Sequence, residues 1–136
     1  MGGNTTINGS NNLTFSGNGT LSAGNTLSIT NSGITTFSGN LSGNGNLTEN
    51  ASVGTVNLSG NNNGYAGTTT LTTGTLQIAT ENNSLGTGTH AVNGGNFKAN
   101  LSATVGNAIT VGGNATINGS NNLTFSGNGT LSAGNT

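Results

Sequence analysis

The feature that most constrains this chain is a long internal repeat. Residues 2–26 (GGNTTINGSNNLTFSGNGTLSAGNT) return as residues 112–136, and the only difference is Ala115 in place of Thr5. The two copies are offset by 110 residues. Such self-similarity is typical of proteins that stack copies of one supersecondary unit. The sequence therefore predicts that 1–136 is one window of a tandem array: 2–111 form a full unit, 112–136 begin the next, and Met1 lies outside the repeated block.

Apolar side chains occur in short alternating pairs, such as Leu13 with Phe15 and Leu76 with Ile78. Alternation with a period of two puts both members of a pair on one face of a strand, and Thr, Ser, Asn or Gln on the other. Most pairs are followed within a few residues by Gly or Asn, which accept the positive φ of tight corners. No window has helical spacing, and the helix formers Lys, Glu and Arg are nearly missing. The chain is predicted to be all-β.

Strands of three to six residues, each with one or two inward side chains, suit a solenoid whose coils pair with the coils above and below. Roughly 18–22 residues per coil, with a rise of about 4.8 Å, predict five or six coils per 110-residue unit. Because identical segments should have equivalent surroundings, we expect each unit to contain a whole number of coils.

Four motifs in the middle of the chain carry a family resemblance. They are GTVNLSG (54–60), NGYAGTTTL (63–71), GTLQI (74–78) and SLGTG (84–88). With these motifs, the segment 47–88 resembles the autotransporter-associated β-strand repeat of bacterial passenger domains. Thr68 stands where that family commonly has a second Gly, and Glu49 where it commonly has Lys. The resemblance implies a right-handed parallel β-helix in a large secreted or surface-anchored bacterial protein.

The composition excludes several functions. Charged residues make up 2% of the chain, and Asp, Arg and Cys are absent. One Lys cannot neutralise a phosphate backbone, so nucleic-acid binding is excluded. Gly94-Gly95-Asn96 and Gly112-Gly113-Asn114 superficially resemble calcium-binding repeats, but the hard anionic ligands are missing. No signal peptide or apolar run of about 18 residues is present, so no membrane insertion is expected in this window.

The few titratable residues do not form a predicted catalytic, cofactor or metal site. His90 is expected to face solvent, and the chain has no Asp or Cys to partner it. Glu49 and Glu81 are expected on different coils. A paired-carboxylate hydrolase generally needs several charged groups along one face, so an enzyme is not expected. Lys98 is interpreted as a solubilising edge charge. We therefore predict no catalytic residue, no cofactor and no metal ligand.

Asn, Thr and aromatic residues allow further interpretations. Asn8, Asn12, Asn46 and Asn100 lie in N-x-S/T sequons, which are glycosylation acceptors but arise by chance in this composition. We expect Asn residues at the corners to form side-chain amide ladders between coils. Ice-binding solenoids need a regular T-x-T rank, and the triplets at 68–70, 73–75 and 87–89 are irregularly spaced.

The aromatic residues are predicted to be structural. Phe15, Phe37, Phe97 and Phe125 are expected to form one internal aromatic stack. Tyr65 is expected to cover the edge of a neighbouring coil, and sugar stacking is its less favoured alternative.

Two non-enzymatic functions remain. The favoured one is a structural module of a secreted or cell-surface bacterial protein: a stiff shaft, stalk or filament whose open-ended coils stack end to end on neighbouring copies. The alternative is an adhesin passenger region that binds cells or glycans through many weak contacts along its lateral faces. Ice binding is a third, less favoured, possibility.

Overall fold

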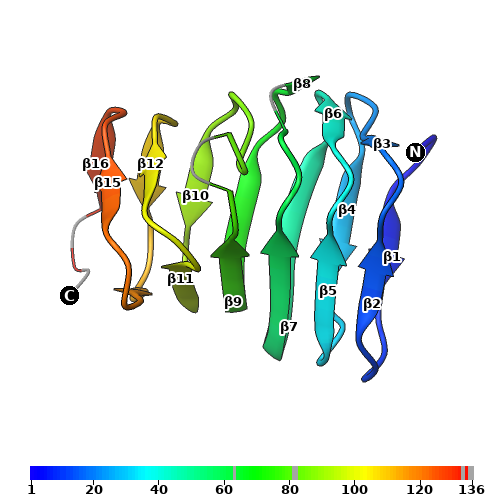
Figure 1. The fold of residues 1–136 in the computed structure, drawn as a ribbon, viewed down its shortest axis with the longest axis horizontal. Helices are drawn as coiled ribbons and strands as arrows, with labels where there is room; N and C mark the ends of the chain where they lie inside the picture. Colours follow the sequence, from blue (N-terminus) through cyan, green and yellow to red (C-terminus); the bar gives the residue numbers. More distant parts are fainter. Residues whose placement is uncertain (63, 81–82, 133, 135–136) are drawn as a thin grey trace.

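The chain folds into a parallel β-solenoid of about six coils, stacked along the long axis of the molecule (Figure 1). This computed structural model describes residues 1–62, 64–80, 83–132 and 134. The strands are β1 (Thr5–Ile7), β2 (Leu13–Phe15), β3 (Gly19–Thr20), β4 (Thr26–Ile29), β5 (Ile34–Phe37), β6 (Leu41–Gly43), β7 (Asn46–Leu58), β8 (Gly64–Tyr65), β9 (Thr69–Ile78), β10 (His90–Val92), β11 (Asn96–Ala99), β12 (Ala103–Val105), β13 (Ile109–Val111), β14 (Thr116–Asn118), β15 (Leu123–Phe125) and β16 (Gly129–Leu131). The all-β, parallel solenoid prediction is confirmed, and the hand of the coil stays a prediction.

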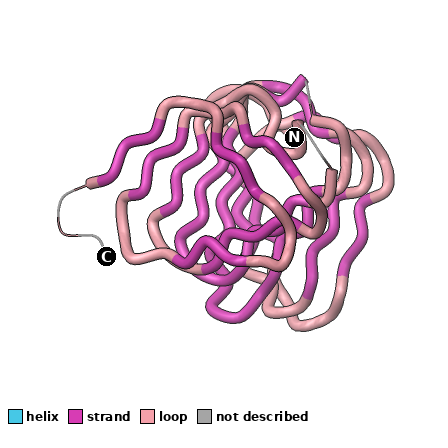
Figure 2. The backbone as a smooth tube through the Cα atoms, turned by 60° about the vertical axis from the view of Figure 1, so that its left-hand side comes forward, coloured by secondary structure: helices cyan, strands magenta, loops and turns pink. Residues whose placement is uncertain are grey.

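Each coil contributes to three faces, visible in the tube of Figure 2. The first face stacks β1, β4, the start of β7, the start of β9, β10, β13 and β16. The second stacks β2, β5, the ends of β7 and β9, β11 and β14. The third carries β3, β6 and β8, and then β12 and β15. Every strand pair is parallel, so each coil presents the same edges to its neighbours.

Alternation along these strands builds the core as predicted. On β4, Leu27 and Ile29 are buried while Ser28 between them is only half-buried. On β9, Leu76 and Ile78 are buried in the same way. Because coils pair in register, the inward side chains form columns along the axis. Apolar burial is thus spread along one continuous core.

Corner glycines let adjacent coils approach closely. A Cβ added to Gly39 would overlap the carbonyl oxygen of Gly17 one coil earlier, and one added to Gly60 would overlap that of Gly39. Gly67 and Gly88 repeat this relation at another corner, where Gly88 lies over Gly67. Glycine is required here because the backbone of one coil fills the space of a side chain on the next.

The corner Asn residues bind the backbone of the next coil rather than one another. The Oδ1 atoms of Asn12 and Asn18 accept hydrogen bonds from the N–H groups of Ile34 and Asn40, both at 2.9 Å. Asn4, Asn40 and Asn46 accept N–H groups of the following coil in the same manner. The predicted amide-to-amide ladder is therefore wrong at these corners. Where strands end, the side chain supplies the acceptor that a ladder carbonyl would otherwise provide.

The phenylalanines form two separate pairs instead of the single stack that the sequence suggested. Phe15 and Phe37 stack with ring centroids 5.2 Å apart. Phe97 and Phe125 lie 5.9 Å apart at the other end of the molecule. The column that contains Phe37 continues with Leu58, because β5 pairs with β7 in that register. Aliphatic side chains thus separate the two aromatic pairs.

The two copies of the repeat lie on different faces, so the prediction of a whole number of coils per unit is wrong. In the first copy β1 pairs with β4 on the first face. The corresponding strand of the second copy, β14, pairs with β11 on the second face. Likewise β2 lies on the second face, whereas its counterpart β15 pairs with β12 on the third. The 110-residue unit therefore spans five coils and one further face. Identical sequences are tolerated on different faces because all three are built from the same short alternating strands.

Gly39→Ala should destabilise the solenoid by about 1–3 kcal/mol, because the new methyl group overlaps the Gly17 backbone. Gly17→Ala is a matched control, since both glycines lie in the sequence Phe-Ser-Gly-Asn and nothing lies within 4 Å of a Cβ added to Gly17. Urea unfolding followed by circular dichroism, at low protein concentration, measures both. Equal urea midpoints of unfolding for the two variants would contradict the conclusion that glycine is required at position 39 by the backbone of the preceding coil.

Candidate functional site

Glu49 is buried in the core, on the first face. Its side chain is 1% exposed, and it occupies the inward column between Ile29 and Leu71 on the adjacent coils. Neither carboxyl oxygen has a hydrogen-bond partner among the residues that the structure describes. Burial raises the pKa of this carboxyl to about 8, and the nearby backbone of Ala51 offsets only part of that rise. Glu49 is therefore a neutral, structural side chain at pH 7.

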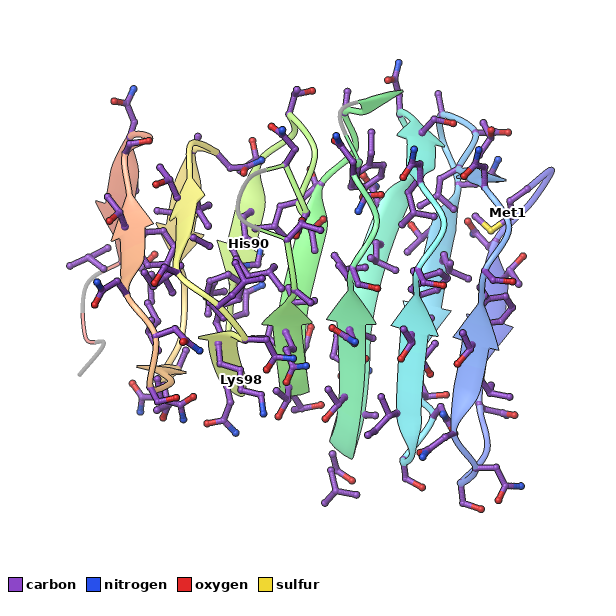
Figure 3. All side chains as sticks on the ribbon, viewed as in Figure 1. Met1, His90 and Lys98 are labelled. Carbon is purple, nitrogen blue, oxygen red and sulfur yellow. The ribbon has the colours of Figure 1, made fainter. Side chains whose placement is uncertain are left out.

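His90 is also buried, so the prediction that it faces solvent is wrong. It follows Thr69 in an inward column and is 0% exposed (Figure 3). Its Nδ1 lies 3.1 Å from the carbonyl oxygen of Thr69, and its ring packs on Phe97 with centroids 4.8 Å apart. Burial lowers the pKa of the imidazole to about 4, although the Thr69 carbonyl partly opposes this shift. The ring is thus neutral and serves as a core residue.

The remaining titratable groups do not converge on a site. Lys98 lies on the outward side of β11, next to Gln77 and Asn118 on the neighbouring coils (Figure 3). Glu81 lies outside the described residues, so the structure does not place the carboxylate pair. Across the described ranges, no group of three His or Glu side chains is arranged to hold a metal ion. Within the same residues, no helix has the length and apolar character needed to cross a membrane.

Tyr65 belongs to the core, which removes the sugar-stacking alternative. Its side chain is 1% exposed, and its hydroxyl donates a hydrogen bond to the carbonyl oxygen of Thr68 at 3.0 Å. Burial raises the pKa of the phenol, so the hydroxyl remains a donor. The ring lies beside the corner glycine Gly67, where it fills space near the turn.

The outward side of the first face carries a regular row of small residues, which are Thr or Ser at every position except Ala91. Strand pairing aligns one residue per coil along this row: Thr6, Ser28, Thr48, Thr70, Ala91, Thr110 and Thr130. The corresponding row of the second face is mixed: Thr14, Thr36, Asn57, Gln77, Lys98 and Asn118. Thr residues are irregularly spaced in the sequence because the coils differ in length. Strand pairing nevertheless aligns one residue of each coil, so these residues form a regular row on the first face.

The two ends of the solenoid expose apolar side chains that are buried in the middle coils. At the N-terminal end Phe15 is 40% exposed, and its partner Phe37 one coil further in is 5% exposed. At the C-terminal end Ile117 and Leu131 are 46% and 78% exposed. Among the described strands, β1, β2 and β3 pair on one side only, as do β14, β15 and β16. Both ends therefore offer strand edges together with apolar surface.

Met1 covers part of the N-terminal end (Figure 3). Its amino group donates a hydrogen bond to the carbonyl oxygen of Thr20 at 2.8 Å, and its side chain packs against the core. An open hollow of about 560 Å³ remains at this end, and Ile7, Phe15 and Leu21 are among its lining residues. The sequence predicted open ends but did not identify the side chains that line this hollow, because their place at the end depends on their position in the first coil.

Comparison with known proteins adds no functional information, because no protein-family model, curated protein or solved structure matches this chain. The buried positions of Glu49, His90 and Tyr65 leave the end faces and the lateral rows as the candidate sites.

The stability of the protein should fall as the pH rises from about 6.5 to 8. The native state keeps the proton on Glu49 up to about pH 8, whereas the unfolded chain releases it near 4.5. Stability therefore falls by about 1.4 kcal/mol per pH unit in between, or about 2 kcal/mol from pH 6.5 to 8. Between pH 4 and 6.5 His90 acts in the opposite sense, because its pKa is lowered on folding and stability rises with pH.

Two variants separate these contributions by urea unfolding at a series of pH values. Glu49→Gln should be flat between pH 6.5 and 8, since it removes the buried proton. His90→Gln should show the Glu49 decline already from about pH 4.5, because the opposing slope is gone. A wild-type protein with constant stability from pH 6.5 to 8 would show that the Glu49 carboxyl reaches solvent.

Proposed function

We propose that this chain is a structural repeat module: a stiff, non-enzymatic shaft whose coils stack end to end on neighbouring copies. The observation that carries the proposal is the pair of end faces, each with strand edges paired on one side only and with apolar side chains such as Phe15 and Leu131 exposed. Covering these faces would bury apolar surface and satisfy backbone groups, which are the interactions that hold each internal coil to the next.

The neutral, buried state of its core titratable groups fits a structural role. Glu49 and His90 contribute no charged group to any surface, and Lys98 is solvated on a mixed polar row. Catalysis by general acid–base chemistry needs such groups within reach of a substrate. We infer that function depends on length and stiffness rather than on reaction chemistry.

We place the shaft in a large bacterial protein that is secreted or held at the cell surface. This part of the proposal rests on the resemblance of 47–88 to autotransporter-associated repeats and on the duplication of 2–26 as 112–136. Adhesion to cells or glycans through the lateral faces is the corresponding alternative, in which many weak polar contacts add up along the rod.

The hydroxyl row of the first face favours a second candidate function, binding to ice. A Thr or Ser hydroxyl occupies this row on every coil except at Ala91, at the strand spacing of about 4.8 Å. An uncharged row of this kind can hold water molecules at a regular spacing. Thr48 and Thr70, on adjacent coils, lie at the centre of this row.

Electron microscopy and sedimentation of the purified chain across a concentration series test the shaft proposal. We expect uniform, unbranched filaments whose fraction rises with concentration, because each end presents the surface that internal coils bury. Single short particles at every concentration would contradict end-to-end assembly and would direct attention to the lateral faces.

Thermal hysteresis of dilute solutions tests the ice-binding candidate. Replacing both Thr48 and Thr70 by Tyr should abolish hysteresis, because two large rings interrupt the row. The control replaces Thr36 and Asn57 by Tyr at equivalent outward positions of the second face and should leave hysteresis unchanged. A wild-type protein without hysteresis eliminates this candidate.

A further inference from the structure

The first and last coils of the chain have nearly the same sequence and the same strand layout. The first coil contains β1, β2 and β3, and the last contains β14, β15 and β16. Adding 110 to the numbers of the first three strands gives the last three to within one residue. The two coils differ in the face on which they start. The first coil runs over faces one, two and three, and the last over faces two, three and one.

The spiral of the chain fixes where a following coil must start. The last described strand, β16, lies on the first face, so the next strand of an uninterrupted solenoid would lie on the second face, over β14. The following two strands would cover β15 and then β16. A second copy that keeps its faces aligned with the first would place β1 over β16 and leave a gap of one strand over each of β14 and β15.

From this we infer that two copies of this chain join with a rotation of one face, so that the first coil of one copy lies in register on the last coil of the other. This inference rests on the end-to-end assembly proposed above. It places each residue of 2–22 directly over its own counterpart in 112–132. Ile7 then lies over Ile117, Phe15 over Phe125 and Leu21 over Leu131. Stacking of identical, in-register strands is a stable arrangement because each side chain meets its own shape.

Contacts inside the solenoid supply precedents for two of these pairs. Phe37 stacks on Phe15 at 5.2 Å and Ile29 pairs with Ile7 in register, and Phe15 of a second copy would lie over Phe125, which contacts Phe97. In the isolated chain Phe15, Ile117 and Leu131 are exposed and Ile7 and Phe125 are partly exposed, so the junction would bury them, whereas Leu21 is buried already.

The corner Asn residues provide a matching polar complement. In the first coil, Asn12 and Asn18 accept the N–H groups of the second coil. Their counterparts in the last coil are Asn122 and Asn128, which would accept N–H groups from the first coil of the next copy.

The corner glycine is matched as well. Gly17 would lie over Gly127 as Gly39 lies over Gly17, with no room for a methyl group between them.

The rotation gives the filament a defined geometry. Each copy adds six coils and one further face, so the rise per copy is about 30 Å at a coil spacing of about 4.8 Å. Three copies return to the starting face after about 90 Å. Filaments of unrotated copies would repeat at every copy.

Cysteine cross-linking tests the register, and the chain has no cysteine of its own. In the variant Thr14→Cys/Thr124→Cys, the two positions lie at opposite ends of one molecule but on adjacent strands at the proposed junction. Their Cα separation would be near 5 Å, within the range of a disulfide. We expect oxidation to give a ladder of covalent oligomers. The control Thr6→Cys/Thr130→Cys would cross-link only if copies stack without rotation, and it should give at least tenfold less oligomer.

Sedimentation of the same samples before oxidation separates the possible outcomes. Monomers throughout would overturn the end-to-end assembly itself. Assemblies that cross-link in the Thr6→Cys/Thr130→Cys variant, or in neither variant, would support end-to-end assembly but would overturn the rotated register.

Two single changes test the junction without altering internal coils. Gly17→Ala should fold normally, because nothing lies within 4 Å of the added Cβ in one molecule, yet it should reduce association at least tenfold. A chain that begins at Gly2 should associate more strongly, because Met1 no longer covers the N-terminal end. Unchanged association in the Gly17→Ala protein would contradict the in-register junction.

Discussion

The close stacking of one coil on the next is the constraint on which the whole structure depends. At a spacing of about 4.8 Å, every backbone N–H and C=O must find its partner on a neighbouring coil. Strands achieve this by ladder pairing, whereas corners do so only in part, as when Ser32 donates to the Gly9 carbonyl. There, Asn side chains supply acceptors to the following coil, as Asn12 does for Ile34, and glycines such as Gly39 leave room for the carbonyl beneath. The abundance of Asn and Gly in this chain follows from that requirement.

The fold could be predicted from the sequence because its signal is local and repeated. Pairs such as Leu76 and Ile78 alternate, lie inward and are bounded by turn residues, and each observation predicts one strand of a coil. The face of the solenoid on which each strand lies could not be predicted in this way. It depends on the summed lengths of the turns, and successive residues of the first inward column, such as Thr69, His90 and Ile109, are 21 and 19 residues apart. The assumption that identical sequences require identical faces failed because the faces themselves are so similar.

The candidate sites were harder to predict than the fold. His90 and Glu49 are polar residues within an alternating pattern, and the polar character of His90 led to the wrong prediction that it faces solvent. Their phase was the better guide: Val92, two residues after His90, is buried on the same side of β10. Glu49 follows Leu47 at the same spacing, and both are buried. The exposed residues of the end faces could not be predicted from their local sequence. Phe15 and Phe37 lie in nearly the same sequence and differ only in whether a further coil covers them.

Each 110-residue unit spans five coils and one further face, so equivalent surface residues of successive units point in different directions around the axis. If successive 110-residue units continue these coils, a surface marker on one unit points a third of a turn away from the same marker on the next. Three units, or about 77 Å of shaft, separate two markers that face the same way. A rigid bivalent ligand approaching from one side would therefore bridge every third unit. Units with the same sequence would then present their equivalent surface residues in three different directions around the rod.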